Sequence, residues 1–198
     1  GSLKDAERHY VEAQEWHSAV NMYRSNEMWE DAFRVAKFYG GNAACKRVTI
    51  ALLMAVGVTE GSKTLSKHGL IETAIEHAAE NGAWDLCFEL ANHSAPKKLP
   101  EVNLKHALFL EDDERFNEAE EAFIRASKPK EAIDMYVHQQ DWASALRVAE
   151  AHDPSTIADV LVAQARTKAD TGNFRAAEEL YLAASRPELA LVMYQEAD

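Results

Sequence analysis

The histidines and cysteines are the residues best suited to metal or nucleophilic chemistry, and their spacing supports neither. No two of the eight histidines stand three or four residues apart, and neither Cys-x-x-Cys nor His-Glu-x-x-His occurs, so a zinc site lacks support. No glycine-rich phosphate loop is present. Cys45 and Cys87 stand at positions of small residues in a helical pattern, which is typical of inert core thiols. We therefore expect no enzyme, no cofactor, no metal site and no small-molecule substrate.

The densest group of ionisable side chains is acidic. It consists of Glu111, Asp112, Asp113 and Glu114, followed by Glu118, Glu120 and Glu121. A calcium loop would need alternating ligands around a central glycine, and this run has neither. Two interpretations remain, a solvated junction between helices or an acidic patch that attracts a basic partner surface in a salt-sensitive way. The four residues from Glu111 to Glu114 are therefore candidate partner-binding residues.

The tryptophans divide into two kinds. Three of them, Trp29, Trp84 and Trp142, recur at equivalent positions of the repeat described below, which favours packing between helices over an exposed binding role. Trp16 differs, because the equivalent position in two later units is a proline, Pro129 or Pro187, at a turn. We therefore take Trp16 as a further candidate partner-binding residue.

Composition limits the partners. The chain has 198 residues, of which 47% are hydrophobic and 27% charged, as in a soluble folded protein. Its 21 basic and 33 acidic residues give a net charge of −12, and residues 101–198 alone carry 10 basic and 20 acidic residues. Nucleic acid is thereby disfavoured as a ligand, because phosphate binding needs a cationic surface. The longest apolar run, near residues 50–58, is too short to span a membrane, so membrane contact is not indicated.

An internal repeat shows which elements carry these side chains. Residues 116–136 align with residues 174–194 at a shift of 58 without a gap, and 10 of the 21 positions are identical. A shift of 113 relates residues 6–36 to residues 119–149 in the same way. Small residues stand three and sixteen positions after the first aromatic residue, and further large residues stand seven and twenty positions after it, as in Phe116, Ala119, Phe123, Ala132 and Tyr136.

This spacing predicts paired helices. Steps of three and four place residues on one helical stripe, and the step of nine from the large residue to the second small one crosses a turn to a second helix. Motif starts near 3, 29, 58, 84, 116, 142 and 174 predict about fourteen helices in seven degenerate tetratricopeptide-like hairpins. We expect an all-α fold, a right-handed α-solenoid over residues 3–198 without separable domains, with residues 1–2 left from an expression tag. Residues 43–75 match the pattern worst.

Several longer runs are more specific than this general pattern. Residues 129–154, 9–23, 100–105 and 109–112 closely resemble the helical-repeat region of the intraflagellar transport protein 172 family. The resemblance extends over nearly the whole chain and is weakest near residues 43–70.

The resemblance implies a role and a location. It implies a segment of a complex B subunit of the trains that carry cargo along the cilium, acting as a scaffold for cargo transport and cilium assembly. Other intraflagellar transport subunits would be its partners, and it would lie in the cilium or flagellum and at the ciliary base, on the cytoplasmic side. The alternative is a helical-repeat scaffold of a vesicle coat or tethering complex, which shares the architecture and differs in its partners.

Overall fold

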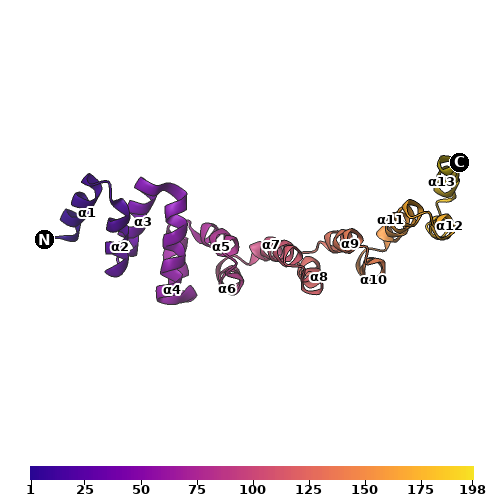
Figure 1. Ribbon diagram of the computed structural model, residues 1–198. Coiled ribbons are helices and arrows are strands. Elements are labelled where there is room, and N and C mark those ends of the chain that lie inside the picture. Colours follow the sequence, from indigo (N-terminus) through magenta and orange to yellow (C-terminus); the bar gives the residue numbers. More distant parts are fainter. The chain divides into compact units, whose positions relative to one another are not determined.

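The computed structural model describes residues 1–198 and contains helices and turns but no strand. The all-α prediction is confirmed. The chain divides into two compact units, Gly1–Val102 and Asn103–Asp198, and passes from one to the other within a helix. Inside each unit, helices that follow one another in the sequence pack side by side (Figure 1).

The helices of the first unit are α1 (Leu3–Glu12), α2 (Trp16–Ser25), α3 (Trp29–Val35), the π-helix η1 (Ala36–Gly40), α4 (Gly41–Lys67), α5 (Ile71–Glu80), α6 (Trp84–Ser94) and the 3₁₀ turn η2 (Pro96–Lys98). The unit boundary falls inside α7 (Leu99–Asp112). The second unit continues with α8 (Phe116–Arg125), α9 (Pro129–His138), α10 (Trp142–His152), the 3₁₀ turn η3 (Pro154–Thr156), α11 (Ile157–Asp170), α12 (Phe174–Ala183) and α13 (Pro187–Ala197).

Most helices begin at the residue that the repeat predicts. The first residues of α1, α8 and α12 and those of α3, α6 and α10 are the predicted motif starts, Leu3, Phe116, Phe174, Trp29, Trp84 and Trp142. Pro129 and Pro187 begin α9 and α13, where a missing backbone N–H costs nothing. The Asp141 carboxylate accepts a hydrogen bond from the backbone N–H of Ser144 at 3.2 Å and caps α10.

Helix ends also recur in register. Ser127, with φ +57°, follows the last turn of α8, and the N–H of Lys128 donates to the carbonyl oxygen of Phe123 at 2.9 Å. This is the left-handed helix terminus that usually requires glycine. The equivalent position 58 residues later holds Ser185, with φ +59°. The helix thus ends at the same position in these two repeats, with a serine in the left-handed conformation in both.

The structure departs from the predicted pattern where the repeat matched worst. Helix α4 is a single long element interrupted at Gly57, where φ is +83° and ψ is 168°. A shift of 58 places its two parts on α7 and α8, so Gly57 replaces the turn that separates those helices. A Cβ atom added to Gly61 would lie 2.8 Å from Cδ2 of Leu53, so the glycine allows the two parts of α4 to approach.

One stretch, Trp29–Lys67, has the length and the apolar composition of a candidate membrane span. The helix is not regular along this stretch, because η1 and the break at Gly57 interrupt it. Its apolar residues Val48, Leu52 and Leu53 are buried in the core of the first unit. Of the apolar window in this stretch, 33% is buried, and one such helix is weak evidence for membrane insertion.

The cores consist of small and aromatic residues at the repeat positions. In the first unit, Ala19, Tyr23, Ala32 and Ala36 are buried together with residues of α4, α5 and α6. In the second unit, the buried residues form two clusters, one around Phe123 and Tyr136 and the other around Tyr181. Alanines at helix contacts let the helix axes approach, and the aromatic rings fill the space between them.

Candidate protein-interaction surface

Two identical sets of polar contacts join three consecutive helices. In the central triad, the Tyr136 hydroxyl donates to Oε2 of Glu120 at 2.6 Å, and Arg147 donates to both carboxylate oxygens at 2.8 and 2.7 Å. In the N-terminal triad, Tyr23 donates to Glu7, and Arg34 donates to its two oxygens at 2.9 and 2.7 Å. The residues of the two triads are related by the shift of 113. The bidentate pairing fixes the geometry more firmly than a single contact would.

A third copy is partial. The Tyr194 hydroxyl donates to Oε2 of Glu178 at 2.8 Å, at the shift of 58 from Tyr136 and Glu120. The position equivalent to Arg147 is 205, which lies outside residues 1–198. The shifts that align the tyrosines and arginines also place Glu7, Glu120 and Glu178 in register, but the role of these glutamates was not predicted from the sequence.

The electrostatics of the triads are structural rather than catalytic. The hydrogen bonds from Arg34 and Arg147 hold the pKa of Glu7 and of Glu120 below the usual value, against the opposing effect of burial. Burial, together with the negative glutamate, raises the pKa of Tyr23 to about 12 and raises that of Tyr136 as well. Each triad therefore contains a charged glutamate and a protonated tyrosine at neutral pH, and neither side chain is poised to exchange a proton.

The acidic candidates lie at the end of α7. Glu111 and Asp112 occupy its last turn, and Asp113 and the left-handed Glu114, with φ +58°, follow it. Burial, and then the neighbouring Asp112, raises the pKa of Glu111. The only ion pair of these four side chains joins Asp113 to Arg115 at 3.9 Å. Negative charge at a helix C-terminus opposes the helix dipole, so this arrangement does not serve stability.

Trp16 is half-buried, less exposed than expected. Its ring stacks on His17 with 3.5 Å between ring centroids and packs against the core of the first unit. A Cβ atom added to Gly40 would lie 2.3 Å from the Cη2 atom of Trp16, so the ring fills the space that this glycine leaves open. Trp16 lies in the first unit, and the acidic candidates lie in the second.

The other tryptophans pack as predicted but are not fully enclosed. Trp29, Trp84 and Trp142 are partly buried against the hydrophobic clusters of their units. The indole Nε1 of Trp29 is buried without a hydrogen-bond partner. A buried donor of this kind is costly, which fits a ring held in place by its packing.

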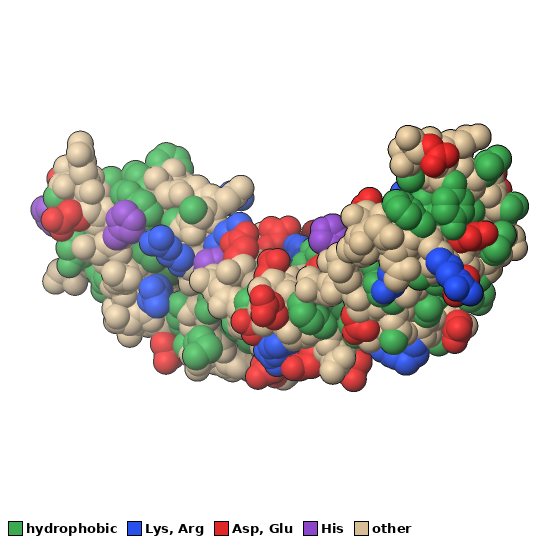
Figure 2. Space-filling model, turned by 45° about the vertical axis from the view of Figure 1, so that its right-hand side comes forward, with side chains coloured by type: hydrophobic (Ala, Val, Ile, Leu, Met, Phe, Trp, Pro, Cys, Tyr) green, Lys and Arg blue, Asp and Glu red, His purple; other side chains and the backbone are tan.

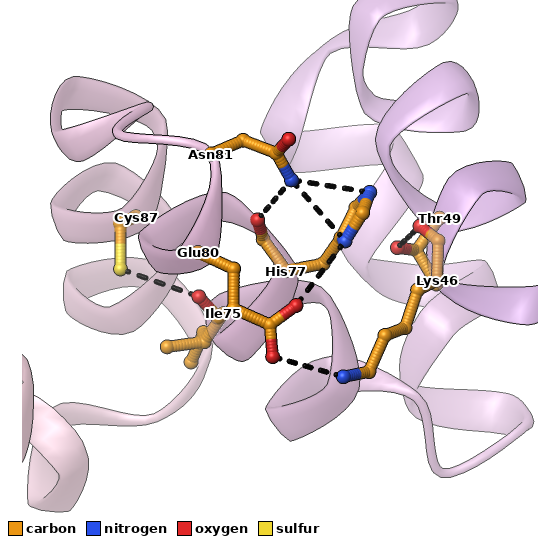
Figure 3. Close-up of polar contacts among 7 residues, drawn as sticks. All are labelled: Lys46, Thr49, Ile75, His77, Glu80, Asn81 and Cys87. Carbon is orange, nitrogen blue, oxygen red and sulfur yellow. Dashed lines mark hydrogen bonds and ion pairs between the residues drawn. The ribbon is translucent and has the colours of Figure 1, made fainter. Parts of the chain in front are cut away.

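A further set of polar contacts joins α4 to α5 (Figure 3). Nζ of Lys46 donates to Oε1 of Glu80 at 3.0 Å, and Nδ1 of His77 lies 3.7 Å from Oε2 of the same carboxylate. The hydrogen bond from Lys46 lowers the pKa of Glu80. On the neighbouring helix, the buried Cys87 donates through Sγ to the carbonyl oxygen of Ile75 at 3.5 Å, and Cys45 is also buried. The burial predicted for the two cysteines is confirmed.

Residues 1–198 contain no group of three or more histidine, cysteine, aspartate or glutamate side chains that could hold a metal ion. The polar contacts described above link helices to one another. What the arrangement offers is surface, namely helix ends and grooves between helices.

No protein-family model matches the chain. Among curated proteins, the intraflagellar transport protein 172 of Chlamydomonas reinhardtii is 51% identical over 197 residues, which is 100% of this chain and 11% of that protein. The Homo sapiens homologue gives the same values, and the Caenorhabditis elegans intraflagellar transport protein osm-1 is 37% identical over 196 residues. The chain thus spans about 11% of the length of these relatives. At this identity over its whole length, the chain belongs to the intraflagellar transport protein 172 family and corresponds to one segment of its members.

Proposed function

We propose that this segment is a structural scaffold within an intraflagellar transport subunit of complex B, and not an enzyme. In this role it holds other transport subunits for cargo transport and cilium assembly, in the cilium and at the ciliary base on the cytoplasmic side. The observation that carries the proposal is the 51% identity over the whole chain to intraflagellar transport protein 172 from an alga and from vertebrates. The same observation favours a transport train over a vesicle coat or tether.

The mechanism we propose is that of a helical-repeat support. Residues 3–198 would form one solenoid segment of seven tetratricopeptide-like hairpins with a right-handed superhelix, and a partner would pack on the face lined by the first helix of each hairpin. The regular helix starts and the recurring triads support this proposal, because they repeat the same contacts between neighbouring helices.

The proposed contacts are the acidic residues Glu111, Asp112, Asp113 and Glu114, and Trp16 elsewhere on the chain. The acidic run departs from the repeat, since the shift of 58 places residues 53–56 (Leu-Met-Ala-Val) and 169–172 (Ala-Asp-Thr-Gly) at the same positions. A cluster that opposes the helix dipole and is absent from the equivalent helices is better explained by a basic partner surface than by folding.

An affinity purification from ciliated-cell extract at two salt concentrations tests the proposal. We expect the chain to retain intraflagellar transport subunits at low salt and to lose them at high salt, because an acidic contact is screened by ions. The variant with Glu111→Gln, Asp112→Asn, Asp113→Asn and Glu114→Gln should retain less. The control changes four exposed carboxylates elsewhere, Glu150→Gln, Asp159→Asn, Asp170→Asn and Glu179→Gln, and should behave as the unmodified chain.

The opposite results would contradict the proposal. Retention of vesicle-coat or tethering subunits in place of transport subunits would favour the alternative function. Equal retention by the two four-fold variants would show that the acidic run at the end of α7 is not the contact.

A further inference from the structure

A cavity of about 360 Å³ opens between α2, η1 and the start of α4 in the first unit. Val20, Ala36 and Val48 form its apolar floor, Trp16 forms one wall, and Arg24 and Arg47 lie at its rim. We call these six residues the α2–α4 groove. Its volume suits a few side chains of a bound segment rather than a folded domain.

The groove has a specific construction. The π-helix η1 shifts the register of the backbone between α3 and α4, and such elements are rare and frequently lie at functional sites. Gly40, the last residue of η1, leaves the space that the Trp16 ring occupies. On the same π-helix, Phe38 is 80% exposed and Tyr39 is 41% exposed. Two aromatic rings of η1 thus face solvent, in a surface where other hydrophobic side chains are also exposed (Figure 2).

The charge of the groove is opposite to that of the chain. Arg24 and Arg47 are exposed and make no ion pair, and His17 adds a third nitrogen base to the lining. No carboxylate lines this cavity, whereas the cavities between the start of α8 and the end of α9 and beside α13 each contain at least one, such as Glu118 or Glu196. In a chain of net charge −12, this cavity thus has two arginines and no carboxylate over an apolar floor.

The groove also departs from the repeat at the residues that form it. At the shift of 113, Trp16 corresponds to Pro129 and Arg24 to the half-buried Val137. At the further shift of 58, the same positions hold Pro187 and Gln195. Local departures from a consistent pattern tend to lie at functional sites.

We propose that the α2–α4 groove binds an acidic amphipathic segment of a partner protein. Its apolar side chains would cover Val20 and Val48 beside the Trp16 ring, and its carboxylates would pair with Arg24 and Arg47. Charge complementarity selects this occupant, since Arg24, Arg47 and His17 are the only ionisable groups that line the groove. The inference rests on the proposed scaffold function. It assigns an acidic partner to this groove, whereas the acidic run at the end of α7 would bind a basic partner.

The test is a selection from a library of random 15-residue peptides displayed on phage, with the 198-residue chain as the bait. Enriched peptides are synthesised with a fluorescent label, and their binding is measured by anisotropy. We expect acidic sequences with large apolar residues three or four positions apart. Arg24→Glu with Arg47→Glu should weaken their binding about tenfold or more, as expected for charge reversal at a contact. Phe38→Ser should weaken it less.

The matched control is Lys128→Glu with Lys130→Glu, which makes the same change of charge at exposed positions of the second unit that form no ion pair. It should leave the affinity within about twofold of the unmodified chain. Circular dichroism and the melting temperature verify that both variants fold.

Three results would overturn the inference. They are the absence of any enriched sequence, enrichment without an acidic bias, and equal weakening by the groove variant and its control. Binding of the chain to phosphatidylserine vesicles that is lost in the groove variant would assign the surface to a membrane and also overturn it. Because the selection contains no ciliary component, it can fail while the affinity purification succeeds, and the reverse holds as well.

Discussion

The regions 116–152 and 58–94 occupy equivalent positions of the repeat and are held together differently. In the first, Glu120, Tyr136 and Arg147 connect α8, α9 and α10 through charged hydrogen bonds. In the second, the shift of 58 places Ser62, Ala78 and Glu89 at those positions. The buried Ser62 hydroxyl instead contacts Nδ1 of His93 on α6 at 3.2 Å.

This difference shows which residues are needed for two helices to pack together and which residues add further stability. Both regions keep small residues at the helix contacts. Ala132 in one region and Ala74 in the other are equivalent, and both side chains are fully buried. The small residues therefore set the approach of the helices, and the triad adds a cross-link that one region lacks. The region without a triad has glycine at its two left-handed turn positions, Gly69 and Gly82, where the other has Ser127 and Gln140. The region without a triad therefore has unstrained glycine turns, and the region with a triad has strained turns at the same positions.

The largest effect should come from removing the tyrosine of the central triad. Tyr136 is 3% exposed, so Tyr136→Ala should reduce the free energy of unfolding by about 3–4 kcal/mol through loss of packing. Urea denaturation measures this, with Tyr39→Ala, at a residue 41% exposed, as a control that should cost about 0.5 kcal/mol or less. A loss equal to that of the control would mean that region 116–152 depends on its alanines as region 58–94 does.

The next effect concerns the partial third copy. Leu191 is 60% exposed, whereas its counterpart Ile133, 58 residues earlier, is 2% exposed and belongs to a buried cluster that includes residues of α10. A second copy of residues 141–152 appended after Asp198 would take positions 199–210, in register with α10. Burial of Leu191 and completion of the contact to Glu178 should raise the free energy of unfolding by about 2 kcal/mol.

Two variants of this extension distinguish its contributions. Replacing the appended copy of Arg147 by glutamine should remove part of the gain and leave the share due to burial. A scrambled extension of the same composition should give no gain. An equal gain from the scrambled extension would show that the shift of 58 does not continue beyond α13.

Much of the fold could be predicted from the sequence, because small and large residues recur at fixed intervals in the repeat. The helix starts at Phe116, Trp142 and Phe174 follow from small and aromatic residues at fixed intervals. The break in α4 could not be predicted this way, since Gly57 and Gly61 replace the usual turn by a conformation specific to one place. A periodic pattern predicts the features that recur in every repeat, but it does not predict a local exception in one of them.

The candidate site was less accessible to sequence reasoning. The glutamates of the triads were missed because a carboxylate on a helix surface is ordinary in a chain with 33 acidic residues, and only its three-dimensional partners give it a role. The exposure expected for Trp16 was too high, because nothing in the sequence signals that the π-helix η1 brings Gly40 against its ring. Arg24 and Arg47 are 23 positions apart, and only the fold places them on one cavity.

The ionic part of the triad should be smaller than its packing part and dependent on pH. Arg147→Gln should cost about 1 kcal/mol at pH 7, since the arginine side chain is 57% exposed and its pairing is partly screened by solvent. The pKa of Glu120 is lowered in the folded state, so this stabilisation is present above the unfolded value of 4.5 and is lost as the pH falls through the folded pKa.

Denaturation at pH 7 and at pH 3 measures this dependence. Arg125→Gln, which removes a pair exposed on both sides, is the control and should have little effect at either pH. An Arg147→Gln penalty that is the same at both pH values would show that Glu120 acts through packing alone, as the neutral Ser62 does in region 58–94.

The turn positions allow a reciprocal exchange between the two regions. Gln140, with φ +57°, and Gly82, with φ +69°, are equivalent at the shift of 58. Gln140→Gly should raise the free energy of unfolding by about 0.5–1 kcal/mol, because it relieves a left-handed side chain, and Gly82→Gln should lower it by a similar amount. No atom lies within 4 Å of a Cβ added to Gly82, so steric clash does not contribute. Effects of the same sign from both exchanges would contradict the equivalence.

The smallest effect, and the one that bears most on function, is at Glu111. Its counterpart in the first unit is the buried Leu53, so region 99–112 has a carboxylate where region 41–54 has a core residue. Because the folded state raises the pKa of Glu111, its protonated form is favoured below pH 4.5, and that stability is lost as the pH rises through the folded pKa. Glu111→Gln should therefore stabilise the protein at pH 7 by a few tenths of a kcal/mol and make no difference at pH 3.

The same variant should retain less of the transport subunits in the affinity purification. If Glu111 lowers the stability of the fold and strengthens partner binding, its role is the contact with the partner. If its replacement changes neither stability nor binding, Glu111 belongs to a solvated helix end. Thermal denaturation at the two pH values, combined with the retention of partners, therefore decides between the two interpretations of the acidic run. A stabilised variant with undiminished retention would leave the end of α7 as a junction between helices and shift the search for the contact to the groove beside Trp16.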